Sequence, residues 1–349
     1  MATKRLEYID ALRGFTMILV VFAHIINYGY HITDAKAETM DTFNNLFIRF
    51  RMPLFFFISG FVLYKQERIW DKPFIKDFIK KKFFVQIVPT FIFLFLFAYL
   101  YNINYIGSLS EMKSGYWFTI ALFEFFVLYI VCIKINWGGI DIQILTISIM
   151  LYLIGSAYRY YQLHSEDIWI LDFIGIIHWR YYFFFVLGTL VKKYYSNFCQ
   201  RMDNQYISAV IIILMVVVHF VVSRFFPIHQ YNTVTFLIQG TLGIMIVFTF
   251  FRRYEDSFSK TTFIGKWLQY IGRRTLDIYL LHYFFLPRNV DELGQFFFDY
   301  SNPVLEFFVS LFLALLVIVI CLVTSNIIRL SPFLGHYPVW GKAGIIDGQ

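Results

Sequence analysis

The chain has 349 residues, of which 59% are hydrophobic and only 15% are charged. A soluble domain of this length needs more charged side chains to cover its surface, so the composition excludes an ordinary soluble protein and indicates a polytopic membrane protein. The net charge of +7 does not indicate nucleic-acid binding, because the basic residues lie in short segments between apolar runs, as in membrane proteins that are oriented by cationic loops.

Ten apolar segments are each about long enough to cross a bilayer as a helix, which takes roughly 20 residues. They are predicted at residues 8–29, 47–64, 83–101, 116–133, 141–157, 173–191, 205–223, 233–251, 268–287 and 304–328. The first segment is predicted to remain as a signal anchor, since no small-residue cleavage site follows it. We therefore predict an all-α membrane protein with one transmembrane domain over residues 1–328 and a short cytoplasmic tail over 329–349.

The basic residues outside these segments predict the orientation of the chain. If the N-terminus is cytoplasmic, most of them fall on the cytoplasmic side and few fall in the outer loops, as the positive-inside rule requires. Both termini are then cytoplasmic, which requires an even number of spans. The three cysteines are far apart and the eight histidines have no spacing typical of metal ligands, so no bound metal is predicted.

The first predicted helix carries three ionisable residues, Asp10, Arg13 and His24, in the stretch DALRGFTMILVVFAH. Arg13 and His24 are eleven positions apart, so the two side chains share a helix face and lie about 16 Å apart along the axis. Asp10 can pair with Arg13 three residues later. A structural salt bridge and a histidine bonded to a neighbouring helix would also explain the pattern, but ionisable groups inside a membrane are more often functional.

Polar residues also mark the second predicted helix, which begins with FRMPLFFFISGF over residues 50–61. Arg49 and Arg51 are predicted near the outer interface of the membrane. Ser59 and Gly60 are small enough to let another helix approach closely. Arginines that reach toward lipid headgroups and ordinary small-residue packing are the alternative interpretation of these features.

The ninth predicted helix contains the stretch IGRRTLDIYLLHYFF over residues 271–285. Arg273 and Arg274 lie at its cytoplasmic end. Tyr279 and His282 follow inside the helix on one face, and the predicted topology places His282 at a depth similar to that of His24. Helix-end anchors and a hydrogen bond within the bundle are the alternative.

Together, these residues predict a polar path through the membrane. Glu124, inside the fourth predicted helix, belongs to it because a buried glutamate needs a partner such as an arginine. Such a path suits a transporter or an enzyme whose two substrates arrive from opposite sides. The cationic residues at its predicted inner end are Arg13, Lys81, Lys82, Arg273 and Arg274.

At these residues the sequence resembles the integral-membrane acyltransferase family 3. The stretch YIDALRGFTMILVVFAHI has that family's arginine, ten intervening residues and histidine, and RMPLFFFISGFVLY matches its second-helix motif. Weaker matches follow in GYWFTIALFEFFVLYIV, WRYYFFFVLGTLV and IGRRTLDIYLLHYFF. The resemblance covers nearly the whole chain in order and implies ten spans.

The resemblance implies transfer of an acyl group from cytoplasmic acyl-CoA, first of all acetyl-CoA, to a hydroxyl reached from the outer side of the bacterial inner membrane. The acceptor would be a cell-surface glycan or another hydroxyl compound. His24 takes the position of the family's essential histidine and would act as general base. Arg13, with Asp10 as its partner, takes the position of the family's arginine, and Ser59 that of the serine in the second-helix motif.

The chain departs from the family pattern before the third predicted helix, in KKKFFVQIVP over residues 80–89. Lys82 keeps a charge there, but Phe83 and Gln86 stand where the family often has arginines. Lys80, Lys81, Arg273 or Arg274 would then help Arg13 to hold the CoA phosphates. The alternative function is a transporter or flippase for an anionic or lipid-linked sugar substrate, which the lack of a visible inverted repeat argues against.

Overall fold

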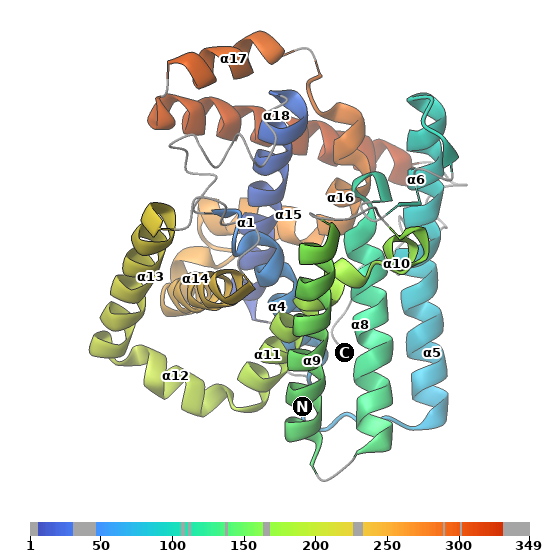
Figure 1. Ribbon diagram of the computed structural model, residues 1–349, viewed down its shortest axis with the longest axis vertical. Coiled ribbons are helices and arrows are strands. Elements are labelled where there is room, and N and C mark those ends of the chain that lie inside the picture. The colour runs from blue at the N-terminus through green and yellow to red at the C-terminus, as the bar shows by residue number, and fades with distance from the viewer. Residues whose placement is uncertain are drawn as a thin grey trace. The chain divides into compact units, whose positions relative to one another are not determined.

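The computed structural model describes residues 6–30, 47–105, 109–110, 113–136, 139–162, 168–225, 233–288, 290–300 and 302–330. Within these residues all regular elements are helices and no strand is present (Figure 1), which confirms the predicted all-α class. The chain divides into two compact units. Unit 1 comprises Met1–Phe55 and Gln239–Gln349, and unit 2 comprises Phe56–Ile238.

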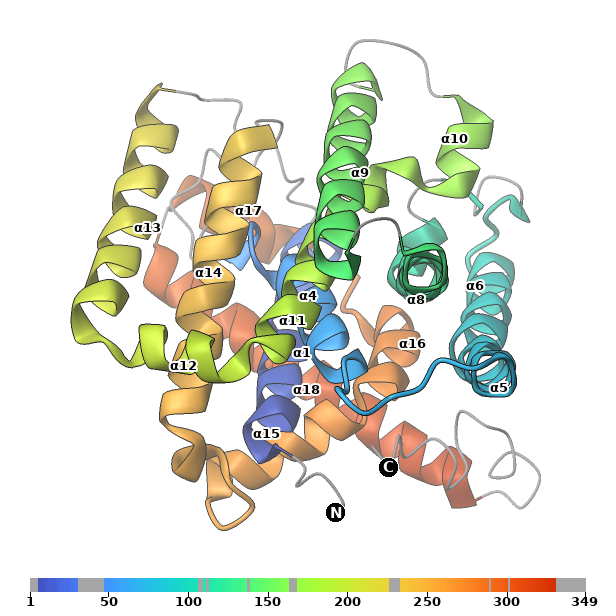
Figure 2. The same ribbon diagram turned by 90° about the horizontal axis from the view of Figure 1, so that it is seen from below.

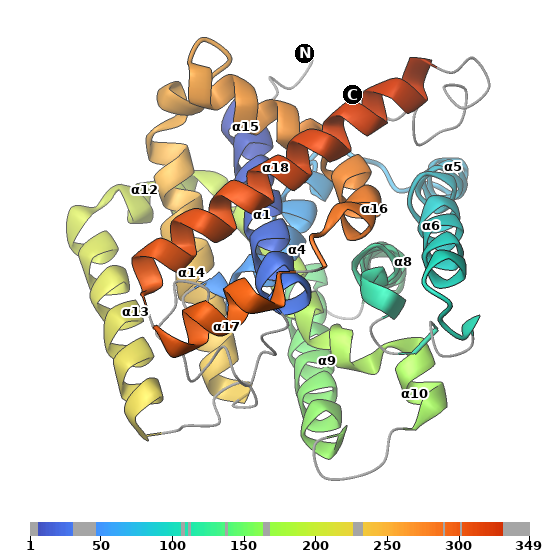
Figure 3. The same cartoon turned by 90° about the horizontal axis from the view of Figure 1, so that it is seen from above.

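Unit 1 is built around α1, which runs from Glu7 to His24 and continues as the π-helix η1 over Ile25–Gly29. α1 packs most extensively against α15 and also contacts α16 and α18; Figure 3 shows α18 crossing it. The other elements are the first part of α4 (Arg51–Leu63), the second part of α14 (Thr233–Arg253), η6 (Glu255–Phe258), α15 (Phe263–Arg273), α16 (Thr275–Phe285), α17 (Asp291–Asp299) and α18 (Pro303–Leu330).

Two glycines allow α1 and α15 to touch backbone to backbone. A Cβ atom on Gly14 would lie 2.0 Å from the carbonyl oxygen of Leu268, and one on Gly272 would lie 1.8 Å from that of Asp10. No side chain fits at such distances, so glycine is required at both positions for close helix packing. This contact fixes the cytoplasm-proximal half of α1, as the predicted topology orients it, next to the start of α16.

Unit 2 holds the middle of the chain. Its elements are the second part of α4, α5 (Lys72–Lys82), η2 (Phe83–Ile87), α6 (Val88–Leu100), η3 (Lys113–Gly115), α8 (Trp117–Ile135), α9 (Ile140–Gln162), α10 (Trp169–Ile174), η4 (Ile176–Tyr181), α11 (Tyr182–Lys193), α12 (Tyr195–Asp203), α13 (Gln205–Phe225) and the first part of α14. α5, η2 and α6 form one helical column that begins at the N-cap Asp71 (Figure 1).

The predicted close approach at Gly60 is confirmed within unit 2. A Cβ atom on Gly60 would lie 1.9 Å from the carbonyl oxygen of Phe185, and one on Gly188 would lie 2.0 Å from that of Phe57. α4 and α11 therefore cross at a reciprocal pair of glycines, as α1 and α15 do in unit 1. Ser59 is half-buried next to this crossing.

Among the described residues, six helices are long and apolar enough to cross a membrane. They are Glu7–Gly29, Lys72–Leu100, Trp117–Ile135, Ile140–Gln162, Thr233–Arg253 and Pro303–Leu330. Each contains or overlaps one of the ten predicted segments, and the third predicted helix begins earlier than expected because α5 leads into it. The cytoplasmic location of both termini stays a prediction, since residues 1–5 and 331–349 lie outside the described part of the chain.

Of the other four predicted segments, three are short or broken helices, and the fourth, at 205–223, is the continuous helix α13. α4 has 13 residues. The segment predicted at 173–191 is interrupted at Gly175, whose φ of 78° ends α10, and the one at 268–287 is interrupted at Arg274 between α15 and α16. α13 follows α12 at a bend of 82°, which is visible in Figure 2.

Candidate active site

His24 is the last residue of α1, directly before the π-helix η1. Single π-helical turns inside longer helices frequently occur at functional sites. His24 and Arg13 are both half-buried, whereas most residues of α1 between them are buried. The two ionisable side chains thus occupy the less covered positions of an otherwise enclosed helix.

A cluster of aromatic side chains from α16 surrounds His24. The hydroxyl of Tyr283 lies 3.1 Å from His24 Nε2 and forms a hydrogen bond with it. The His282 ring stacks on the His24 ring with 5.2 Å between the ring centroids. The ring centroids of Tyr283 and His282 lie 4.1 Å apart. His24 and His282, which the sequence places at a similar depth, are therefore in contact in unit 1, with Tyr283 joining the two rings.

The hydrogen bonds of the two histidines indicate which ring nitrogens carry the proton. His282 Nδ1 lies 3.0 Å from the carbonyl oxygen of Ile278 and 2.9 Å from that of Tyr279, so Nδ1–H is the donor and Nε2 keeps the lone pair. Nδ1 of His24 is buried and has no partner among the described residues. An orphaned buried N–H is rarer than an orphaned acceptor, which favours the tautomer in which His24 Nε2–H donates to Tyr283.

Two ring nitrogens in the cluster are consequently hydrogen-bond acceptors without a donor. They are Nδ1 of His24 and Nε2 of His282, both buried and without a partner in the described part of the chain. A buried polar group without a partner costs free energy. A molecule that brings hydroxyl groups to this cluster would satisfy both nitrogens.

The charged residues of unit 1 fall into separate groups. Arg13 pairs with the buried Asp10 at 3.9 Å, as the sequence predicts. Arg51 lies within electrostatic reach of His24, while Arg49 is buried. Arg273, at the end of α15, is exposed.

Arg274 belongs to a network that sequence analysis missed. The carboxylate of Asp277, which is 3% exposed, binds Arg274 at 3.3 Å, Arg329 at 2.8 Å and the hydroxyl of Ser325 at 2.5 Å. Arg274 also donates to Ser325 at 3.2 Å. These contacts join α16 to α18, so Arg274 is engaged in holding the two helices together.

Four residues that the sequence singles out belong to unit 2 instead. Glu124 on α8 accepts a hydrogen bond from the Trp179 side chain, and Lys113 contributes positive charge nearby, so its predicted arginine partner is replaced by these two residues. Lys82 lies over the ring of Phe126 at 4.7 Å. The other two are the half-buried Ser59 and the exposed Lys81.

Tyr283 is the main residue of the cluster that sequence analysis did not select. Tyr283 directly follows His282 in the sequence. Helical spacing points instead to Tyr279, which lies three residues before His282 on the same face of the helix. The ring of Tyr279 is buried and lies 6.1 Å from that of His282. The sequence does contain a signal for Tyr283, because it is an aromatic residue directly next to a histidine inside a membrane helix. Adjacent side chains on a helix point in different directions, so His282 and Tyr283 can both contact one side chain of a neighbouring helix.

Comparison with known proteins places the whole cluster in one family domain. Residues 6–323 match the family model described as an acyltransferase domain, which is the acyltransferase family 3 of membrane proteins. No curated protein and no solved structure matches the chain. Among the described residues, no group of three or more histidine, cysteine or acidic side chains is arranged to hold a metal ion.

Proposed function

The chain belongs to the acyltransferase family 3 of membrane proteins, and from this membership we propose that it is a membrane O-acyltransferase. It takes an acyl group, acetyl in the first place, from cytoplasmic acyl-CoA and passes it to a hydroxyl of a cell-surface glycan or a similar acceptor. It acts in the bacterial inner membrane with ten spans and both termini in the cytoplasm.

The observation that supports this reaction best is the pair of unsatisfied imidazole nitrogens beside Tyr283. Nδ1 of His24 and Nε2 of His282 are lone-pair acceptors without donors, so they are complementary to an acceptor substrate that carries hydroxyl groups. Neutral imidazole is also the side chain best suited to accept a proton near neutral pH. His24 is partly exposed, whereas His282 is fully buried and anchored to its own helix, which assigns the role of base to His24.

In the proposed reaction, the acceptor hydroxyl donates its hydrogen bond to Nδ1 of His24. As the hydroxyl oxygen attacks the thioester carbonyl, its proton passes to Nδ1, and the bond to sulfur breaks to release CoA as a thiolate. The imidazolium then returns the proton to that thiolate, so the products are the ester and CoA–SH. Tyr283 accepts the hydrogen bond from Nε2–H throughout and keeps the ring oriented.

Arg13 is proposed to hold the diphosphate of the donor, with Asp10 fixing its position. It precedes His24 by eleven residues on one helix, a rise of roughly 16 Å at 1.5 Å per residue, which an extended pantetheine arm can cover. Arg273, Lys81 and Lys82 are proposed to assist in donor binding. The residues proposed to support the acceptor side are Arg49, Arg51, Ser59, Glu124, Tyr279 and His282.

The test is acyl transfer by purified His24→Gln protein in lipid nanodiscs, with acetyl-CoA and a panel of glycan acceptors. Glutamine keeps an amide within reach of Tyr283 but cannot act as a base, so transfer should fall by at least about a hundredfold while acetyl-CoA binding is kept. The matched control is His219→Gln, a half-buried histidine on α13 of unit 2, which should transfer normally. Wild-type transfer rates in His24→Gln would contradict the assignment, and substrate movement without acylation would favour a transporter.

A further inference from the structure

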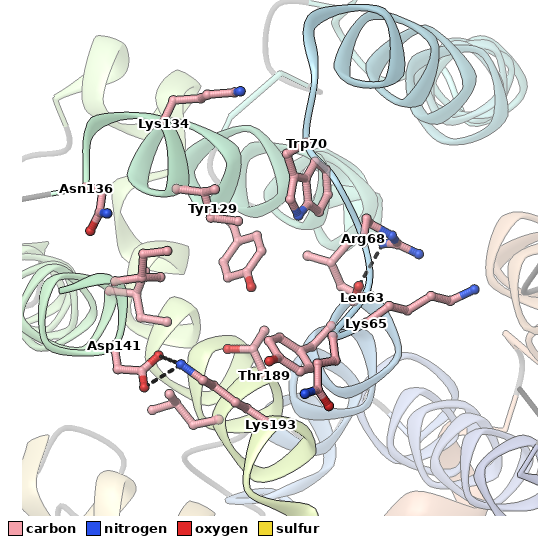
Figure 4. Close-up of a pocket in the computed structure, with 16 residues that line it drawn as sticks. Leu63, Lys65, Arg68, Trp70, Tyr129, Lys134, Asn136, Asp141, Thr189 and Lys193 are labelled. Atoms are coloured by element: carbon pink, nitrogen blue, oxygen red, sulfur yellow. Dashed lines mark hydrogen bonds and ion pairs between the residues drawn. The ribbon is translucent and has the colours of Figure 1, made fainter.

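Unit 2 contains a second candidate site, a cavity of about 560 Å³ (Figure 4). Its walls come from the segment that follows α4, the end of α8, the start of α9 and the end of α11. The size is within the range of small-molecule binding pockets. None of its lining residues is among the site residues that the sequence predicts.

The cavity, here called the basic pocket, carries an excess of positive charge. Its lining includes four cationic side chains, Lys65, Arg68, Lys134 and Lys193, against one carboxylate, Asp141. Lys193 binds both oxygens of that carboxylate at 2.7 Å. In the described residues no salt bridge reaches the remaining three cations, which leaves the pocket complementary to a multiply charged anion.

Two of these cations are held in an unfavourable environment. Burial and the neighbouring charge of Arg68 lower the pKa of Lys65, and burial lowers the pKa of Arg68. Arg68 is fixed in place, since its guanidinium donates to the carbonyl oxygen of Leu63 at 2.8 Å. A bound anion would offset the cost of desolvating these side chains.

The basic pocket also offers flat aromatic surface and neutral polar groups. The guanidinium carbon of Arg68 lies 5.5 Å from the centroid of the Trp70 ring, and Trp70 contacts Tyr129 edge-on at 6.2 Å. Figure 4 shows these rings on one side of the pocket, with Thr189 and the Asp141–Lys193 pair on the other. Cations next to aromatic rings and a hydroxyl match the chemistry of a phosphorylated nucleoside, in which a base stacks while phosphates bind the cations.

We propose that the basic pocket binds the 3′-phosphorylated adenosine end of the acyl-CoA donor, an inference that rests on the proposed function. The base packs against Trp70 and Tyr129, and the 3′-phosphate is bound by Lys65, Arg68 and Lys134. The predicted topology places all of these segments on the cytoplasmic side, where acyl-CoA is found. A phospholipid headgroup also carries phosphate but has no planar base to place against the aromatic wall.

The first experiment measures binding of adenosine 3′,5′-bisphosphate to the full-length protein in phosphatidylcholine nanodiscs by calorimetry. We expect binding that is weakened about tenfold by Lys65→Gln and by Lys134→Gln, since each removes one charge-assisted hydrogen bond. The control is Lys76→Gln, which removes an equal charge from an exposed position of α5 outside the pocket and should leave binding unchanged. Equal affinity for wild type and both pocket variants would overturn the proposal.

A second experiment avoids substitutions. Amine-reactive labelling of Lys65 and Lys134 in the wild-type protein is followed by mass spectrometry, with CoA, 3′-dephospho-CoA or phosphopantetheine present. CoA should protect both lysines several-fold better than phosphopantetheine, with dephospho-CoA between them. Protection by anionic phosphatidylglycerol nanodiscs alone, with no effect of CoA, would identify a lipid headgroup as the occupant and overturn the proposal.

The outcomes separate this inference from the proposed function. If CoA binds and His24→Gln abolishes transfer while the pocket lysines are neither protected nor required, only the nucleotide assignment fails. If CoA protects Lys65 and Lys134 while the protein transfers no acyl group to any tested acceptor, the pocket stands as a CoA-binding site and the acyltransferase proposal fails.

Discussion

Tyr283 contributes a single hydrogen bond to the candidate active site, so its role can be tested by removing one atom. Tyr283→Phe keeps the ring contacts with His24 and His282 but leaves His24 Nε2 without its partner at 3.1 Å. A neutral hydrogen bond contributes about 0.5–1.5 kcal/mol, so we expect kcat to fall by about two- to tenfold with little change in the KM for acetyl-CoA.

The control for this substitution is Tyr300→Phe, at an exposed position after α17. It should alter neither rate nor stability. If Tyr283→Phe raised the KM for the acceptor and left kcat unchanged, Tyr283 would contribute equally to binding of the substrate and of the transition state. It would then be a substrate-binding residue and would not orient the histidine.

Asp277 is expected to matter for stability. Asp277→Asn removes the charge that pairs with Arg274 and Arg329, both of which are partly buried. Breaking a buried pair on one side costs about 3–5 kcal/mol; since the arginines are 22% and 21% exposed, we expect a smaller loss, about 2 kcal/mol. This loss of stability is measured by heating the protein with a thiol-reactive dye, which labels the buried Cys321 when the protein unfolds.

Asp299→Asn provides the matched comparison, because Asp299 is exposed and accepts a hydrogen bond from Gln295 within α17. Its melting temperature should stay within about a degree of wild type, as is usual for surface substitutions. Equal melting temperatures for the two variants would mean that the Asp277 network does not stabilise the packing of α16 on α18.

At the scale of the elements, the crossing of α1 and α15 depends on the absence of two side chains. Alanine normally favours a helix over glycine by about 1 kcal/mol, yet at Gly272 the added Cβ would lie 1.8 Å from the carbonyl oxygen of Asp10. The helices must separate, so we expect Gly272→Ala to destabilise unit 1 by about 1–3 kcal/mol. The same dye labelling of Cys321 during heating measures the change in stability.

The effect of Gly272→Ala should also reach the candidate active site, since α1 carries His24 and α16 begins two residues after α15 ends. Lys266→Ala on an exposed position of α15 is the control and should be neutral within about 0.5 kcal/mol. A Gly272→Ala protein that is more stable than wild type would show that helix propensity outweighs the overlap and that the two backbones adjust easily.

Much of the helix content could be predicted from apolar runs, because a segment of membrane length has to be helical to satisfy its backbone. The small-residue signal at Gly60 also predicted a real crossing. The interruptions were harder to find. Gly175 ends α10 through a positive φ. The helices η1 and η2 are π-helical, and a π-helical turn depends on the packing of neighbouring helices and has no simple sequence pattern.

The candidate site was predictable to the extent that it depends on spacing along one helix. Asp10, Arg13 and His24 are visible in the sequence because charge inside an apolar segment is conspicuous. The partners Tyr283, Ser325 and Arg329 come from helices far away in the chain, and their polar groups are ordinary for membrane-protein helices. The basic pocket could not be predicted either, since Lys65 and Arg68 follow α4 while Lys134 and Lys193 lie at the ends of α8 and α11, and only the fold brings these segments together.

For the whole molecule, the sequence predicts ten membrane crossings, whereas six of the described helices are long and apolar enough to cross a membrane. Labelling two positions can decide between these numbers. Lys76 on α5 and Glu292 on α17 are both exposed. The helical column Lys72–Leu100 has 29 residues, roughly 44 Å at 1.5 Å per residue, which exceeds the hydrocarbon core of about 30 Å. Its lysine-rich start can therefore extend into the cytoplasm.

The parity of the crossings between these two positions separates the alternatives. If only the long helices cross, namely Lys72–Leu100, α8, α9 and α14, then Lys76 and Glu292 lie on the same side. If α11, α13 and the α15–α16 segment cross as well, the number becomes odd and the two positions lie on opposite sides. The charges favour the second arrangement, because α5 is rich in lysine while α17 has acidic residues and no basic ones, in agreement with the positive-inside rule.

We therefore expect single cysteines at Lys76 and Glu292, in a background with the three native cysteines replaced by serine, to label differently with a membrane-impermeant maleimide. Intact cells or spheroplasts should label Glu292→Cys at once and Lys76→Cys only after permeabilisation. Ile92→Cys, on an exposed apolar position of α6, should resist labelling in both states because lipid covers it. Labelling of both positions from the same side would reduce the molecule to fewer than ten spans, and the reverse pattern would place the termini outside.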